Sequence, residues 1–236
     1  MNMTDISTNL KNIRKRIDLA LESSDRVTKD VILVAASKGQ SSEAIRVAYE
    51  CGQRHFGENY LQEAQKKQCE LADLSDICWH FIGPIQSNKT SKISNNFDWV
   101  HTVDRLKIAQ RLSGTRDVSK PLLNICVQVN VSKEITKSGV SLHDCTKIAN
   151  IISAYPRLNL RGLMTMPKSD MSDEAHKEVC ETMSKLLLET RINSSKSAVL
   201  DTLSMGMSSD FERAIKEGAT IVRLGSAIFG ARKLLK

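Results

Sequence analysis

The sequence predicts an α/β protein in which apolar strands alternate with amphipathic helices. Two observations predict it. Residues 31–36 are an unbroken apolar run, rich in β-branched side chains, which is typical of a strand buried on both faces of a parallel sheet. Eight such runs recur along the 236 residues, each followed by a helical pattern. Strict alternation indicates a parallel sheet, and eight units in a chain of this length indicate a closed (β/α)8 barrel of the TIM type.

An extra helix precedes the first predicted strand. In residues 4–22, apolar side chains recur every three or four positions, beginning with Ile6, Leu10 and Ile13, as in a helix with one buried face. We therefore expect residues 1–30 to pack outside a single barrel domain formed by residues 31–236. The alternative fold, a doubly wound open sheet, usually has a glycine-rich first βα turn, and residues 37–40 do not match it.

The remaining elements follow in chain order. Ser41 and Ser42 can cap the first barrel helix, and Gly52 can close it. Ser209 and Glu212 have the spacing of a capping box. Strands are predicted at residues 31–37, 54–57, 79–83, 99–103, 122–130, 158–165, 199–204 and 220–224, and helices at 41–52, 60–71, 89–93, 104–112, 141–153, 173–190, 209–218 and 227–235.

Composition excludes several classes of protein. The net charge of +7 suits anionic ligands, but an aromatic content of 4% is poor for base stacking, so we expect no nucleic acid partner. No apolar stretch is long enough for a bilayer, and the polar N-terminus does not resemble a signal peptide. The six cysteines include no C-x-x-C pair, which favours reduced thiols, no metal site and a cytoplasmic protein.

Lys38 is the first candidate site residue. Side chains alternate between the faces of a strand, so Lys38 shares a face with Val34 and Ala36 at the exit of a buried strand. Partial desolvation there would lower the pKa of its amine and make it a nucleophile. The alternative is that Lys38 only begins a solvated loop.

Two small turns suggest a phosphate site. In (β/α)8 barrels the active site lies at the carboxyl ends of the strands, and phosphate often binds after strands seven and eight. Residues 204–208 and 224–227 follow those predicted strands and supply hydroxyls, glycines and backbone N–H groups. Ser204, Gly225 and Ser226 are the candidates, although ordinary tight turns use the same residue types.

Arg223 interrupts the last apolar strand on the face that points into the barrel. A guanidinium in that position needs an acceptor, because an unpaired buried charge is costly. The acceptor could be a buried carboxylate, such as Glu58 or Asp201, or the ring nitrogen of a ligand. An aldehyde-reactive lysine, a phosphate site and a partner for a ring nitrogen are together what a barrel needs to hold pyridoxal phosphate.

These residues lie in segments that resemble the pyridoxal phosphate homeostasis proteins, which are barrels similar to the N-terminal domain of alanine racemase. The segments run in order from the first strand to the end: Ala35–Lys38, Phe56–Tyr60, Trp79–Lys89, His101–Arg105, Val129–Ser132, Arg161–Pro167, Leu203–Ser208, Val222–Ser226 and Ile228–Gly230. Within them we expect His80 to be a packed strand histidine and Tyr60 to lie in the core.

The resemblance implies a role for each candidate residue. Lys38 would carry pyridoxal 5'-phosphate as an internal aldimine, Asn59 would lie near the ring, and Arg223 would face the pyridine nitrogen. Ser204, Gly225 and Ser226 would hold the phosphate.

The resemblance also implies a non-enzymatic function, the buffering or delivery of pyridoxal phosphate to apo-enzymes, and we expect a monomer. The alternative is a fold-type-III enzyme such as an amino-acid racemase. Alanine racemase takes a second acid/base from a C-terminal domain of a partner subunit, and this chain ends at Lys236, so we expect that domain to be absent.

Overall fold

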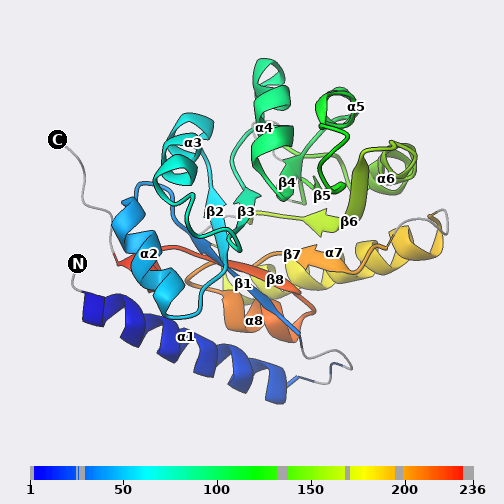
Figure 1. Ribbon diagram of the computed structural model, residues 1–236. Coiled ribbons are helices and arrows are strands. Elements are labelled where there is room, and N and C mark those ends of the chain that lie inside the picture. The colour runs from blue at the N-terminus through cyan, green and yellow to red at the C-terminus, as the bar shows by residue number, and fades with distance from the viewer. Residues whose placement is uncertain are drawn as a thin grey trace.

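The computed structural model describes residues 3–24, 26, 30–131, 138–167, 171–194 and 199–230. Its strands are all parallel and close into a barrel in chain order, from β1 to β8 and back to β1 (Figure 1). The predicted (β/α)8 fold is therefore confirmed, and the open-sheet alternative is wrong. No helix of the described residues is long and apolar enough to cross a membrane.

The strands and helices lie close to their predicted places. The strands are β1 (Ile32–Ala36), β2 (His55–Glu58), β3 (Cys78–Phe81), β4 (Trp99–Val103), β5 (Leu123–Gln128), β6 (Leu158–Met164), β7 (Thr202–Ser204) and β8 (Ile221–Leu224). The helices are α1 (Met3–Glu22), α2 (Ser42–Glu50), α3 (Leu61–Glu70), η1 (Ser87–Lys89), α4 (Thr90–Asn96), α5 (Leu106–Thr115), α6 (Cys145–Ser153), α7 (Asp173–Ile192), α8 (Phe211–Lys216) and α9 (Ser226–Phe229).

Most boundaries differ from the prediction by one to four residues, and three differences have a visible physical reason. Strands β5 and β7 begin later, because Leu122 and Val199 are exposed rather than paired in the sheet. Helix α9 ends at Phe229, where Gly230 takes a φ of +76°. Residues 231–235 of the predicted last helix lie outside the described residues.

Only one of the two predicted N-caps is present. The Ser41 hydroxyl accepts a hydrogen bond from the Ala44 N–H at the start of α2. The capping box of Ser209 and Glu212 is wrong, because α8 begins after Asp210 and the Glu212 carboxylate binds Arg16 of α1 at 2.7 Å.

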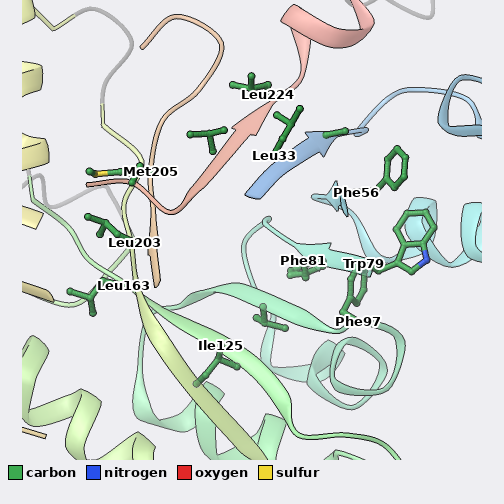
Figure 2. Packing of buried hydrophobic residues seen from close by; sticks show 14 of the residues in the cluster. Leu33, Phe56, Trp79, Phe81, Phe97, Ile125, Leu163, Leu203, Met205 and Leu224 are labelled. Atoms are coloured by element: carbon green, nitrogen blue, oxygen red, sulfur yellow. The ribbon is translucent and has the colours of Figure 1, made fainter. Parts of the chain in front are cut away.

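Two apolar layers follow from the alternation of side chains along each strand. The larger layer lies between the barrel and its helices, and it includes Leu33, Phe56, Ile125 and Leu224 (Figure 2). The smaller layer fills the barrel interior with Val34, Trp99, Cys126, Met164 and Ile221.

Helix α1 lies outside the barrel, as expected, along α8, α9 and α2 (Figure 1). Its buried face carries Ile6, Leu10 and Ile13. The Asn9 amide also donates to the backbone carbonyl of Ile228 at 3.0 Å. Helix α1 therefore supports α9, which follows the strand that carries Arg223.

Candidate functional site

A cavity of about 340 Å³ opens at the carboxyl ends of the strands. This volume lies in the usual range for small-ligand sites. Five of the six predicted site residues line it, namely Lys38, Asn59, Arg223, Gly225 and Ser226. The other lining residues are Ala36, Gln40, Ile82, Met166, Met207, Ser208, Ser209 and Gly230.

Barrel closure is what brings Lys38 and Arg223 to the same cavity. Strand β1 pairs with β8, and Val34 lies opposite Arg223 in that register. Both strands point their carboxyl ends at the cavity. Gly225 lies so close to β1 that a Cβ added to it would stand 3.2 Å from the Ala36 carbonyl oxygen. A larger residue there would therefore crowd the turn between the two strands.

Arg223 is a buried cation without a described carboxylate partner. It is 5% exposed, and its guanidinium donates to Ser204 Oγ at 2.6 Å and to the Thr165 carbonyl at 2.9 Å. Burial lowers the pKa of Arg223 to about 10, so it remains charged at neutral pH. Both described acceptors are neutral, and the side chain therefore favours an anionic or lone-pair acceptor in the cavity that it lines.

The two carboxylates proposed as partners of Arg223 bind other cations, so that alternative is wrong. Glu58 points toward α3 and pairs with Lys67 at 2.7 Å. Asp201 pairs with Arg161 at 2.7 Å.

Ser204 does not line the cavity, although we predicted a phosphate contact for it. It is fully buried in the barrel, where its hydroxyl lies 2.8 Å from His101 Nδ1 and accepts from Arg223. The physical reason is that Ser204 is still part of β7, with its side chain on the interior face. This position suits a residue that orients Arg223 rather than one that contacts a phosphate.

Ser208 and Ser209 are hydroxyl-bearing lining residues that were not among the named candidates, although the sequence placed Ser208 in the loop 204–208 that could supply hydroxyls. They follow β7 by four and five positions, on a loop that turns at Gly206 with a φ of +97°. The Ser208 hydroxyl accepts from the Ala227 N–H at 3.3 Å and so joins this loop to the turn after β8. The sequence could have indicated Ser208 by its position, because it lies in the loop after β7, at the carboxyl end of the strand.

Asn59 leaves a polar atom for a ligand. Its Oδ1 atom is buried, and it has no hydrogen-bond partner in the part of the chain that the structure describes. The Asn59 backbone packs directly against Gly83. Only glycine fits there, because a Cβ at position 83 would lie 2.1 Å from the Asn59 carbonyl oxygen. A buried unsatisfied acceptor in a cavity costs free energy until a donor arrives.

A buried ion pair supports the residues before Lys38 and Asn59, and the sequence did not reveal it. Lys67 of α3, 4% exposed, donates to Glu58 Oε1 at 2.7 Å and to the Ser37 carbonyl at 2.8 Å. The Ser37 hydroxyl also donates to Glu58 at 2.6 Å. Burial raises the pKa of Glu58, while Lys67 and Ser37 oppose that rise.

Three other expectations concern residues near the site. His80 is fully buried and stacks on Trp99, as expected of a packed strand histidine. Tyr60 is 63% exposed, so its placement in the core is wrong. All six cysteines are free thiols.

Comparison with known proteins adds an independent finding. Residues 8–233 match the family described as alanine racemase, N-terminal domain. The pyridoxal phosphate homeostasis protein of Pseudomonas aeruginosa is 50% identical over 230 residues, which cover 98% of this chain and 97% of that protein. The protein of the same name from Escherichia coli K12 is 42% identical over 238 residues, with coverages of 99% and 100%.

Solved structures agree with the fold. PipY of Synechococcus elongatus PCC7942, solved with PLP bound, is 34% identical with a TM-score of 0.84, and the match covers 95% of this chain and 100% of PipY. Alanine racemase from Corynebacterium glutamicum shares the fold alone, at 14% identity and a TM-score of 0.70, over 97% of this chain and 62% of that one. The chain therefore belongs to the family of pyridoxal phosphate homeostasis proteins, which carry the alanine racemase N-terminal domain.

Proposed function

We propose that this protein binds pyridoxal 5'-phosphate in the strand-end cavity and serves homeostasis of that cofactor in the cytoplasm, by holding it and passing it to apo-enzymes. The observation that carries the proposal is Arg223, a buried cation with neutral acceptors that lines the same cavity as the amine-bearing Lys38. A pyridine nitrogen offers Arg223 a lone pair, and an aldehyde offers Lys38 an electrophile.

Each lining residue has a part in this proposal. Lys38 would hold the cofactor through its amine, a nucleophile toward the aldehyde group that pyridoxal phosphate supplies. Asn59 would lie beside the ring, and its Oδ1 atom, which has no hydrogen-bond partner among the described residues, would be available to a donor. Ser208, Ser209 and Ser226, which line the cavity, would offer their hydroxyls to the phosphate.

Gly225 and Ser204 would support cofactor binding indirectly. Gly225 contributes its backbone, and Ser204 contributes by orienting Arg223. Gly225 keeps the turn after β8 open toward the phosphate. Ser204 is a positioning residue. Its hydroxyl accepts a hydrogen bond from the Arg223 guanidinium at 2.6 Å and so orients that side chain.

The same lining supports a carrier rather than a racemase. Among the described lining residues, Lys38 and Arg223 are the ionisable side chains. Racemisation needs an acid/base on each face of the substrate carbon, and Arg223 is a permanent cation at neutral pH that keeps a pyridine nitrogen unprotonated. We therefore propose no substantial turnover of amino acids.

Reduction with borohydride tests the covalent anchor. The purified protein is incubated with pyridoxal phosphate, reduced, digested and mapped by mass spectrometry, with Lys38→Ala as the variant and Lys89→Ala as the matched control. We expect the adduct on Lys38 in the wild type and in Lys89→Ala. An adduct that stays in Lys38→Ala, or that maps to Lys89, would contradict the assignment.

A transfer assay tests the delivery role. Loaded protein is mixed with an apo-enzyme that needs pyridoxal phosphate, and recovery of that enzyme's activity is compared with the rate at which free cofactor is released. Faster recovery than release supports delivery. Steady racemisation or decarboxylation of an amino acid that disappears in Lys38→Ala would instead identify an enzyme.

A further inference from the structure

A histidine–cysteine cluster lies inside the barrel at the end opposite the cofactor cavity. It consists of His55, Cys78 and His80, and its ligand atoms all lie within 4.8 Å of one another. His55 Nδ1 is 2.9 Å from His80 Nε2, and Cys78 Sγ is 3.5 Å from the same nitrogen. We propose that this histidine–cysteine cluster is a binding site for a divalent transition metal ion of the zinc or cobalt type, held by two imidazole nitrogens and one thiolate.

The strand register builds the cluster. His55 pairs directly with Cys78 across β2 and β3, and His80 lies two positions further along β3 on the same face. All three side chains therefore point into the barrel interior, where Cys78 packs against the interior apolar layer. The sequence suggested no metal site because it contains no C-x-x-C pair, whereas these ligands meet across neighbouring strands.

The spacing fits a four-coordinate ion. Zinc lies about 2.0–2.1 Å from imidazole nitrogen and about 2.3 Å from thiolate sulfur, which in a tetrahedron separates two nitrogens by about 3.3 Å and nitrogen from sulfur by about 3.6 Å. Two of the three distances here, 2.9 Å and 3.5 Å, need shifts of only a few tenths of an ångström, and the third, from His55 Nδ1 to Cys78 Sγ, lies within 4.8 Å. Two nitrogens and one sulfur are a ligand set that zinc uses with water in the fourth position.

The surroundings prepare the cluster for a metal ion. His80 Nδ1 lies 2.9 Å from His101 Nε2, and this is the kind of contact to the far ring nitrogen that orients a metal-binding histidine. Both His80 and His101 are fully buried. His55 also lines a cavity of about 440 Å³ at the amino ends of the first strands.

Metal binding exchanges a proton for the ion. The Cys78 S–H bond breaks, its proton goes to solvent, and a bond from sulfur to the metal forms. Because the thiolate rather than the thiol binds the metal ion, one proton is released for each ion bound. The lone pair of His80 Nε2 then points at the metal, so its proton resides on Nδ1 and is donated to His101.

Cobalt titration of the full-length protein tests the proposal. We expect one equivalent of Co²⁺ to produce the intense visible bands of four-coordinate cobalt and a thiolate charge-transfer band, both abolished by excess Zn²⁺. Cys78→Ser should remove the charge-transfer band and weaken binding at least about tenfold, and His101→Phe should weaken it by about 10–100-fold. Cys69→Ser, which changes the exposed cysteine on α3, is the matched control and should behave as the wild type.

A measurement on the unaltered protein guards against variants that fail to fold. Trp99 stacks on His80 with ring centroids 5.6 Å apart, so bound Co²⁺ should quench its fluorescence and Zn²⁺ should restore it. The proposal is overturned if the wild type shows only the weak spectrum of hydrated cobalt with no quenching, or if Cys78→Ser keeps the charge-transfer band. Loss of the band in Cys69→Ser would also overturn it.

Discussion

Replacement of Lys67 by methionine is the sharpest test of how the site is supported. The change keeps the apolar stem and removes the ammonium group, which leaves Glu58 buried at 0% exposure without its cation. Breaking a buried ion pair in this way costs about 3–5 kcal/mol, a large share of the roughly 5–15 kcal/mol that stabilises a typical protein. The free energy of unfolding, measured by urea denaturation at neutral pH, should fall by that amount.

The pH dependence of this loss follows from the pKa of Glu58. Burial already raises that pKa in the folded protein, so stability falls as pH rises from the unfolded to the folded pKa value. Removal of Lys67 raises the pKa of Glu58 in the folded protein further. The pH range over which stability falls therefore extends to higher pH. The difference in the free energy of unfolding between Lys67→Met and the wild type should therefore be small at acidic pH, where Glu58 is protonated in both proteins. It should be large at mildly alkaline pH.

Two further variants make the result decisive. Lys66→Met is the matched control on the same helix, because Lys66 is 77% exposed and meets Glu70 only at 3.8 Å. Its loss should be less than about 0.5 kcal/mol. The double variant Glu58→Gln/Lys67→Met should regain part of the lost stability. A loss below about 1 kcal/mol in Lys67→Met at neutral pH, or the same loss at every pH, would refute the reasoning.

Three other predictions concern the cofactor cavity. Lys38→Ala should abolish the absorbance band of the aldimine with Lys38, and an aldimine band of unchanged intensity in a spectrophotometric titration would contradict the covalent role. Ser208→Ala and Ser226→Ala should each weaken retention of pyridoxal phosphate by about 1.5–3 kcal/mol, the value of a hydrogen bond to a charged group; unchanged dissociation constants in both variants by fluorescence titration would place the phosphate elsewhere. Gly83→Ala should displace Asn59, since the new Cβ would lie 2.1 Å from the Asn59 carbonyl oxygen. The variant should therefore have a lower melting temperature and a lower affinity for pyridoxal phosphate. A variant equal to the wild type in both measurements would show that this backbone contact is dispensable.

Periodicity predicted the elements because burial imposes it locally. The β1 run and the alternating patterns after it led to the closed barrel, and β4 was predicted at its observed bounds, Trp99–Val103. The end of α9 was misplaced, because an apolar pattern does not reveal that Gly230 takes a left-handed conformation. The capping box failed for a different reason, since Glu212 is drawn to Arg16 of a helix far away in sequence.

Lys38, Asn59, Arg223, Gly225 and Ser226 could be predicted as neighbours from the sequence, because all five follow or end barrel strands, and strand ends meet at one mouth. Only the tertiary structure decided which partner each buried polar side chain binds. Ser204 turned inward to Arg223, Glu58 turned outward to Lys67, and His55 met Cys78 and His80 across two strands. A strand pattern assigns a side chain to a face, but register and barrel closure choose its hydrogen-bond partner, and those depend on residues that lie far apart in the chain.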